Sequence, residues 1–162
     1  MDLKQIEIFT DGSSLGNPGP GGYGAIVSYK GIKKELSQGY RKTTNNRMEM
    51  MGAIAALSAL KERCHVILYT DSQYLADGIM KGWALGWRKR GWVKSNKEKA
   101  LNVDLWSKLL DLLEYHNVEF RWLRGHAGHI ENERCDKLAK QAAVSPGLLA
   151  DAGYEESIGK SV

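Results

Sequence analysis

The chain has 162 residues, 43% of them hydrophobic and 26% charged, which is the composition of an ordinary soluble protein with one core. No apolar run approaches a membrane span, and the acidic N-terminus enters a strand at once instead of forming a signal peptide. The two cysteines, Cys64 and Cys135, are isolated and favour a reducing compartment over a disulfide scaffold. We therefore expect a cytoplasmic monomer with no membrane partner.

Hydrophobic periodicity and turn signals predict elements in the order β-β-β-α-β-α-α-β-α. The helix at 43–62 is expected to begin at Asn45 or Asn46 as its N-cap. Residues 1–145 form one predicted domain, and 146–162, which lack clear periodicity, are expected to be a loose tail. In chain order, the predicted elements cover residues 3–10, 23–29, 33–40, 43–62, 65–70, 72–81, 102–115, 118–123 and 131–143.

The predicted helix at 43–62 can serve as the crossover between the strands that end at Asp11 and Asp71. Those two strands are then parallel and adjacent. Strands one to three would be antiparallel, and strands one, four and five parallel. This predicts an α/β fold with a mixed five-stranded sheet flanked by helices. Ligands of such sheets bind beyond the carboxyl ends of the parallel strands, where both aspartates lie.

The stretch DGSSLGNPGPGGYG, at 11–24, contains the spacing G-x-G-x-x-G of dinucleotide-binding loops. Such a loop must lead from a strand into a helix, because the phosphates rest on the helix N-terminus. Here Pro18 and Pro20 restrict the loop, and the aromatic, β-branched YGAIVSY that follows predicts a second strand. We therefore interpret the loop as an antiparallel connection and expect no organic cofactor.

The predicted fold brings four carboxylates near one sheet edge: Asp11, Glu49, Asp71 and Asp136. Taken singly, they have ordinary alternatives as a turn residue, a capping-box partner of Asn46, a helix cap and a solvated charge. Crowded carboxylates repel one another, and a divalent cation removes that repulsion. Oxygen ligands suit Mg²⁺ or Mn²⁺. Beside a basic, aromatic-rich segment, this cluster suggests two-metal hydrolysis of a phosphodiester.

The net charge of +4 arises from one segment. Residues 81–99 carry seven basic side chains and one acid, Glu98, so the rest of the chain sums to −2. Trp83, Trp87 and Trp92 alternate with these cations, and the first two share a face if the segment is helical. We expect at least one of those two to anchor the segment to the body of the protein. The cations are expected to contact phosphate, because nothing acidic nearby balances them.

Four stretches resemble, in order, the motifs of type 1 ribonuclease H of the bacterial ribonuclease HI kind: FTDGSSLGNPGPGGYGA, TTNNRMEM, YTDSQY and GHAGHIENERCDKLA. The resemblance runs from Leu3 to Ala143, and each motif contains one of the four carboxylates. It implies a ribonuclease H-like fold with a basic protrusion at 81–99. It also implies an endonuclease that hydrolyses the RNA strand of RNA–DNA hybrids and leaves 5′-phosphate and 3′-hydroxyl ends.

The resemblance further assigns residues to the site. It implies two Mg²⁺ ions, for which Mn²⁺ can substitute, at the catalytic and metal-binding residues Asp11, Glu49, Asp71 and Asp136. His126 matches the family's mobile histidine, and an imidazole that titrates near neutral pH suits a proton carrier. The implied substrate-binding residues are Asn17, Thr44, Asn45, Asn46, Gln73, Trp83, Arg88, Lys89, Arg90 and Asn102.

Among these, Asn17, Asn45 and Gln73 are the implied readers of the RNA 2′-hydroxyl, the group that distinguishes RNA from DNA. Thr44 and Asn102 match a pocket for a DNA phosphate, and Trp83 matches a sugar-contacting aromatic residue. The chain departs from the usual bacterial pattern at residue 14, where serine replaces a common cysteine. Because serine is also small and polar, we expect little change.

Other hypotheses stay open on sequence alone. A non-catalytic module that binds nucleic acid would keep the basic segment without needing four carboxylates. A nucleotide-cofactor enzyme would use the glycine-rich loop, and a transposase- or integrase-like relative would need further domains. His126, His129 and Cys135 make a zinc site conceivable, but no second ligand pair stands at zinc spacing.

Overall fold

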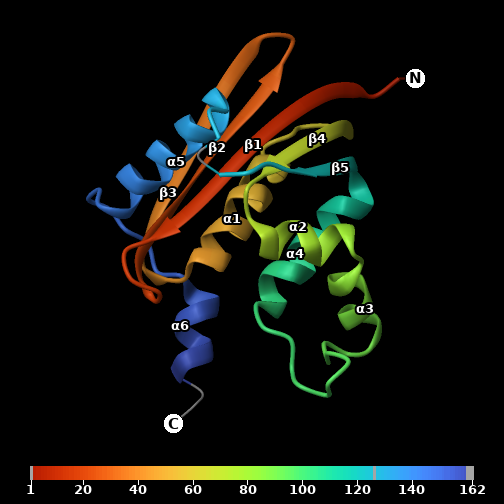
Figure 1. Ribbon diagram of the computed structural model, residues 1–162, viewed down its shortest axis with the longest axis vertical. Helices are drawn as coiled ribbons and strands as arrows, with labels where there is room; N and C mark the ends of the chain where they lie inside the picture. Colours follow the sequence, from red (N-terminus) through yellow and green to blue (C-terminus); the bar gives the residue numbers. More distant parts are fainter. Residues whose placement is uncertain (1, 126, 160–162) are drawn as a thin grey trace.

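The computed structural model of the chain describes residues 2–125 and 127–159. A five-stranded sheet in the order β3-β2-β1-β4-β5 forms its centre (Figure 1). The first three strands pair antiparallel, whereas β1, β4 and β5 run parallel, which confirms the predicted mixed sheet. The strands are β1 (Lys4–Ser14), β2 (Gly19–Tyr29), β3 (Ile32–Thr43), β4 (Cys64–Thr70) and β5 (Asn117–Trp122).

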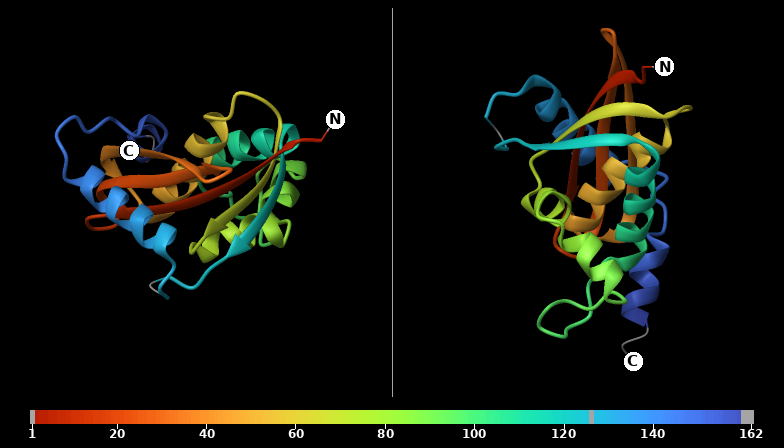
Figure 2. Two further views of the ribbon diagram at one scale, coloured as in Figure 1. Left: turned by 90° about the horizontal axis from the view of Figure 1, so that it is seen from above. Right: turned by 90° about the vertical axis from the view of Figure 1, so that its right-hand side faces the viewer.

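Helices cover both faces of this sheet. Helix α5 packs on β1, β2 and β3 from one side, whereas α1 packs on β1 and β2 from the other, with α4 against α1 (Figure 2). No helix in the described part of the chain is long and apolar enough to cross a membrane. The helices are α1 (Asn45–Ser58), α2 (Gln73–Met80), α3 (Trp83–Lys89), α4 (Val103–Tyr115), α5 (Ile130–Ala143) and α6 (Ala152–Gly159).

Glycines allow the helices to approach the sheet closely. A Cβ at Gly24 would collide with the backbone of α5 at Cys135, and one at Gly12 would collide with the backbone of α1 at Glu49. Alternate residues of a strand face opposite sides of the sheet. Much of the predicted glycine-rich loop is therefore strand that serves helix packing: Gly12 of β1 lets α1 approach one face of the sheet, and Gly24 of β2 lets α5 approach the other.

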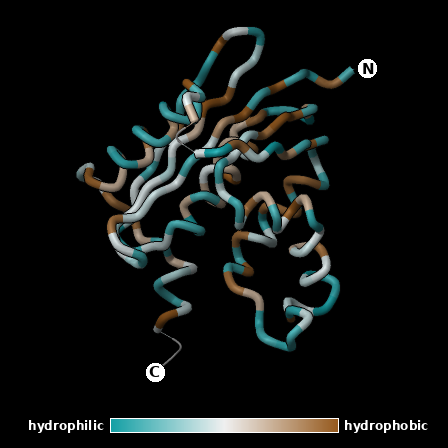
Figure 3. Tube along the Cα trace, in the orientation of Figure 1, coloured by the Kyte–Doolittle hydropathy of each residue, from teal (hydrophilic) through white to brown (hydrophobic). Residues whose placement is uncertain are grey.

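The hydrophobic core lies between the sheet and helices α1 and α4. Ile8 and Leu68 from adjacent strands meet Leu57, Trp106 and Leu109, all of them fully buried. Each such side chain contributes about 1.5–3 kcal/mol through burial. By contrast, the loop that follows α3 is hydrophilic along the chain trace (Figure 3). The core thus packs behind the central strands, and the hydrophilic loop after α3 extends away from it.

Three local predictions need correction. Helix α1 begins after Thr44, not Asn45 or Asn46, because the Thr44 side chain accepts a hydrogen bond from the Arg47 amide at 3.2 Å. Helices α3 and α6 were not among the predicted elements, and each spans only about two helical turns.

The C-terminal segment also differs from the expected loose tail. Leu149 bridges to β3: its amide donates to the Gly39 carbonyl at 3.0 Å, and its own carbonyl accepts from the Arg41 amide at 2.8 Å. Asp151 is buried and accepts hydrogen bonds from the Arg47 guanidinium at 2.7 and 2.9 Å. Residues 149–151 therefore dock on the body of the protein, and α6 follows them at one end of its long axis (Figure 1).

Candidate active site

Two of the predicted carboxylates lie side by side at one end of the parallel strands. Thr10 of β1 pairs in register with Thr70, the last residue of β4, so that Asp71 follows the end of β4 beside Asp11. The prediction that the first strand ends at Asp11 is wrong, because Asp11 pairs with Gly24 of β2 and β1 continues to Ser14. Glu49 reaches the same point from α1, because Gly12 leaves room for the helix backbone. Among the described residues, one oxygen from each of these three carboxylates lies within 4.8 Å of the others. The expected juxtaposition at the carboxyl ends of the strands is thus present.

A single backbone donor holds two of these carboxylates together. The Gly12 amide donates to Glu49 Oε1 at 2.6 Å and to Asp11 Oδ1 at 2.8 Å. Burial raises the pKa of Asp11 to about 6, and repulsion from Asp71 adds to the effect. Burial, with the charges of Asp11 and Asp71, raises the pKa of Glu49 well above its usual range. The cluster therefore resists carrying its full negative charge.

The ordinary alternatives for two carboxylates do not hold. Ser72, not Asp71, caps α2, since its side chain accepts a hydrogen bond from the Leu75 amide at 3.1 Å. Glu49 contacts Gly12 of the neighbouring strand, and the cap of α1 is Thr44. Neither carboxylate acts as a helix cap, so capping does not explain either of them.

The fourth carboxylate, Asp136 on α5, lines the same cleft but stands outside the group of three. Its Oδ2 lies 3.0 Å from the ammonium of Lys140, one helical turn further along α5. The cleft has a volume of about 530 Å³. It is lined by Asp11, Gly12, Ser13, Asn45, Asn46, Glu49, Asp71, Ser72, Gln73, Tyr74, Asp136 and Lys140. The predicted His126 lies outside the described residues.

The end of β5 and the loop after it pack against Asp71. The indole N–H of Trp122 donates to the Asp71 backbone carbonyl at 3.1 Å. A Cβ on Gly125 would lie 2.8 Å from Asp71 Oδ2, so only glycine fits against this carboxylate without moving it. The position of Asp71 therefore depends on residues from the next strand and the loop after it.

Polar side chains at the rim of the cleft are held by one another. Asn45 Oδ1 accepts hydrogen bonds from the Ser14 amide and hydroxyl at 2.8 and 2.9 Å. Asn17 Oδ1 accepts from the Asn45 amide at 3.1 Å. Gln73 is tied to Asp77 at 2.9 Å. The serine that replaces the common cysteine thus orients Asn45 directly through its hydroxyl.

A second cleft, of about 590 Å³, contains the other predicted polar contacts. Thr44 and Asn102 line it together with Asn17, and Asn46 lines both clefts. The Asn102 side chain is oriented from two sides, because its oxygen accepts from Arg47 at 3.3 Å and its nitrogen donates to Tyr74 at 3.0 Å. The two clefts therefore meet at the start of α1.

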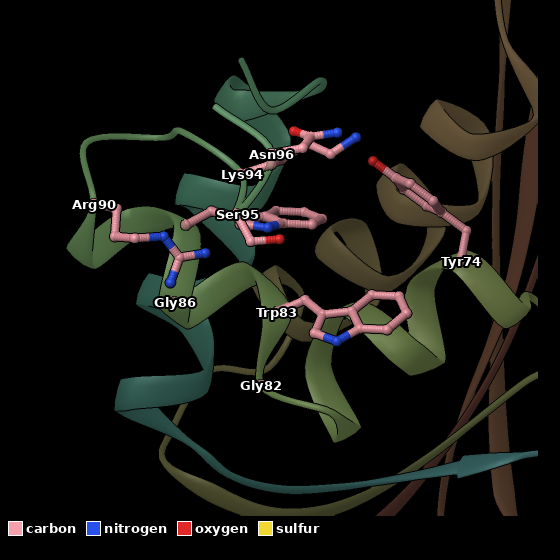
Figure 4. A pocket seen from close by; sticks show the side chains of 9 residues that line it. Tyr74, Gly82, Trp83, Gly86, Arg90, Lys94, Ser95 and Asn96 are labelled. Carbon is pink, nitrogen blue, oxygen red and sulfur yellow. The ribbon is translucent and has the colours of Figure 1, made fainter. Parts of the chain in front are cut away.

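The aromatic residues of the basic segment separate into two roles. Trp87 packs edge-on against buried Trp106, with ring centroids 6.0 Å apart, and anchors α3 as expected for at least one tryptophan. Trp83 is 47% exposed. Its ring lines an open pocket of about 500 Å³ shared with Tyr74 and Arg90 (Figure 4). An exposed aromatic face beside a cation is suited to a sugar or base.

The expectation that nothing acidic balances these cations is wrong for Arg88. Its guanidinium donates to Asp111 at 2.6 Å and lies 3.8 Å from Glu114. Both acids belong to α4 and are distant in sequence, so they reach Arg88 only because α3 packs on α4. Lys89 and Arg90 are exposed and remain the better placed of the three for phosphate.

Comparison with known proteins assigns this arrangement to a family. The protein-family model described as RNase H matches residues 3–144, most of the chain. The chain belongs to the ribonuclease H family. Ribonuclease H of Desulforamulus reducens is 59% identical over 150 residues, covering 93% of this chain and 94% of that protein. Ribonuclease H of Escherichia coli O139:H28 is 58% identical over 156 residues, covering 96% and 99%.

The fold agrees with the type 1 members of the ribonuclease H family. The crystal structure of LC9-RNase H1, described as a type 1 RNase H with the type 2 active-site motif, aligns with a TM-score of 0.78. It is 36% identical, and the alignment covers 97% of this chain and 82% of that one. The predicted ribonuclease H-like fold and ribonuclease H enzyme are thereby confirmed.

Sequence reasoning missed three residues of this ribonuclease H site: Tyr74, Trp122 and Lys140. Tyr74 lies between the acidic cleft and the Trp83 pocket, and its hydroxyl also accepts from Trp106 at 3.0 Å. Only the spacing of Lys140, four residues after Asp136 on a predicted helix, could have indicated one of these contacts.

Proposed function

We propose that this ribonuclease H cleaves the RNA strand of RNA–DNA hybrids with two divalent cations held by Asp11, Glu49, Asp71 and Asp136. The clustering of three carboxylates, from β1, from the end of β4 and from α1, carries the proposal. In this reaction a water oxygen bonds to phosphorus and the bond from phosphorus to the 3′ oxygen breaks. The departing 3′ oxygen takes a proton, which leaves 5′-phosphate and 3′-hydroxyl ends.

The donor set fits a hard divalent cation such as Mg²⁺. All three clustered groups offer carboxylate oxygens, the ligands that Mg²⁺ and Mn²⁺ prefer. Within the described residues, Glu49 Oε2 is buried without a hydrogen-bond partner, which a cation would supply. When bound, the ions supply positive charge that stabilises attacking and leaving oxygens and acidifies water.

The chain itself prepares the site before substrate arrives. The Gly12 amide fixes the carboxylates of Asp11 and Glu49, and Trp122 and Gly125 confine Asp71. Fixed groups avoid reorganisation during the reaction, which is a main source of electrostatic catalysis. His126 stays a proposed proton carrier for the reacting oxygens.

Hybrid recognition is assigned to the two clefts and the basic segment. Asn45 and Gln73 line the acidic cleft, and Asn17 of the second cleft accepts a hydrogen bond from the Asn45 amide, so that the three can read an RNA 2′-hydroxyl together. Thr44 and Asn102 offer polar groups to a DNA phosphate in the second cleft. Residues 81–99 add the exposed Trp83 ring and the cations Lys89 and Arg90, which suit a sugar-phosphate backbone.

A cleavage assay on strand-labelled duplexes tests this proposal. The substrates are RNA–DNA, RNA–RNA, DNA–DNA and DNA carrying one ribonucleotide, each with Mg²⁺ or with EDTA. We expect Mg²⁺-dependent cutting of the RNA strand of RNA–DNA alone, with 5′-phosphate ends. Hybrid binding without cutting would instead support the non-catalytic binding module. Cutting by the Asp11→Asn variant at the wild-type rate would refute the role of the carboxylates.

A further inference from the structure

Lys140 places a positive charge inside the acidic cleft. It lies on α5 one turn after Asp136, its Nζ is 3.0 Å from Asp136 Oδ2, and both residues line the cleft. Its side chain is 58% exposed, whereas that of Asp136 is 23% exposed. The ammonium therefore reaches into the cleft from solvent and is not part of the core.

This ion pair separates Asp136 from the other three carboxylates. Asp11, Glu49 and Asp71 crowd together within 4.8 Å, and burial, together with this crowding, raises the pKa of the first two. Asp136, in contrast, already has a cation against one of its oxygens. One cleft thus holds a crowded group of three carboxylates and a fourth carboxylate that is paired with an ammonium.

We propose that Lys140 is a positioning residue that competes with the divalent cation for Asp136, and this inference rests on the proposed two-ion function. A carboxylate oxygen that bonds an ammonium must release or share it before it can coordinate a metal ion. Lysine suits such an exchange, because its compact charge sits on a flexible four-carbon stem that can swing aside without moving α5. The ion at Asp136 is then bound more weakly than it would be by a free carboxylate.

The size of the effect follows from the exposure of the pair. Exposed ion pairs contribute little, and the energies measured for them correspond to about a 1.5- to 5-fold change in an equilibrium constant. Removing the Lys140 charge should therefore tighten cation binding by about that factor. The released ammonium also remains within the cleft, where it can donate a hydrogen bond to a substrate phosphate.

Calorimetric titration of Mn²⁺ into the full chain tests this competition. Lys140→Met should bind Mn²⁺ about 1.5- to 5-fold more tightly than wild type, and Lys140→Arg should stay close to wild type. Lys137→Met is the matched control, because it removes the same charge from an exposed position of α5 beside Asp136. The Mn²⁺ concentration for half-maximal hybrid cleavage should fall by the same factor in Lys140→Met alone.

A double variant shows whether the effect passes through Asp136. In an Asp136→Asn background, Lys140→Met should no longer tighten Mn²⁺ binding. The inference is overturned if Lys140→Met leaves both readouts unchanged, or if Lys137→Met tightens binding equally, since net charge would then explain the effect. Wild-type chain that binds no Mn²⁺ in the presence or absence of hybrid would overturn the proposed function as well, which separates the two failures.

Discussion

Asp11 and Glu49 accept hydrogen bonds from one backbone amide, that of Gly12, at 2.8 and 2.6 Å. The two carboxylates come from β1 and α1, and both are nearly buried. A shared donor compensates only part of the burial and repulsion of two negative groups, so the pKa of each is raised. The folded state therefore carries an electrostatic cost at neutral pH that a bound cation would relieve.

The first prediction is that Asp11→Asn stabilises the protein at pH 7. Because the folded pKa of Asp11 is raised from 3.8 to about 6, the folded state binds the extra proton between these pH values. Wild-type stability should fall as pH rises through that window and stay reduced above it. The neutral amide avoids this loss and should add on the order of 2 kcal/mol to the free energy of unfolding at pH 7.

Urea unfolding at pH 3.5 and pH 7 measures this effect. The gain of Asp11→Asn should be much smaller at pH 3.5, where the carboxyl is protonated in the folded state and largely protonated in the unfolded state. Glu156→Gln, at an exposed carboxylate of α6, is the control and should change stability by less than about 0.5 kcal/mol. A destabilised Asp11→Asn at pH 7 would contradict the inferred repulsion.

The second prediction concerns Mg²⁺ and stability. A cation that binds the folded state alone should stabilise it by about 1.4 kcal/mol when its concentration is ten times Kd. The wild-type melting temperature should therefore rise with added MgCl₂, compared with NaCl at the same ionic strength, and Asp11→Asn should lose most of that rise. Equal shifts for both proteins would show that Mg²⁺ binds elsewhere.

The sheet could be predicted because the hydrophobic pattern of each strand is local in the sequence and strongly periodic. The strand at residues 65–70 reads as buried on both faces, and the crossover rule then fixes β1 and β4 as parallel neighbours. Helix α6 could not be predicted in this way. Its placement relies on the Asp151–Arg47 ion pair, whose partners are 104 positions apart in sequence.

The same distinction holds within the site. The strand-end rule places Asp11 and Asp71 together, and a helix crossing between those strands accounts for Glu49. Side-chain pairing is a different matter. The pair of Lys140 with Asp136 follows the i,i+4 spacing within α5. The pair of Arg88 with Asp111, in contrast, depends on the packing of α3 on α4. Because this packing is not visible in the sequence, the charge count predicted only a nucleic-acid contact for Arg88.

The third prediction is that Asp151→Ala destabilises the protein strongly. Asp151 is 1% exposed and pairs with Arg47, itself 3% exposed. Asp104 would remain as the second carboxylate partner of Arg47, but removing Asp151 leaves buried donors of Arg47 and the Thr43 hydroxyl without their acceptor. Unsatisfied buried donors typically cost about 1–3 kcal/mol, and more where one of them is charged. Glu155→Ala is the comparison, because its pair with Arg41 is more exposed and should contribute about 1 kcal/mol or less. Similar unfolding midpoints for the two variants in urea would contradict a structural role for Asp151.

The fourth prediction is that Trp122→Phe lowers turnover without weakening hybrid binding. Phenylalanine keeps an aromatic side chain, although a smaller one, and removes the N–H that donates to the Asp71 carbonyl. Because one neutral hydrogen bond contributes about 0.5–1.5 kcal/mol, kcat should fall roughly 2- to 10-fold while KM stays near its original value. Trp83→Phe should behave in the opposite way, raising KM through its exposed ring. Raised KM with unchanged kcat in Trp122→Phe would make Trp122 a substrate contact.

The fifth prediction separates the three adjacent cations of the basic segment. Lys89→Ala with Arg90→Ala should raise KM more than it lowers kcat, since phosphate contacts stabilise ground and transition states alike. Each lost contact should also reduce the slope of log affinity against log salt by roughly 0.9. Arg88→Ala also removes one positive charge, but the Arg88 side chain is paired with Asp111 on α4. Its salt slope should remain close to wild type, with a modest loss of stability instead. If Arg88→Ala reduces the salt slope as much as the loss of Lys89 or Arg90, then the hybrid must break the Arg88–Asp111 pair on binding, and α3 would have to be treated as one continuous phosphate-binding surface.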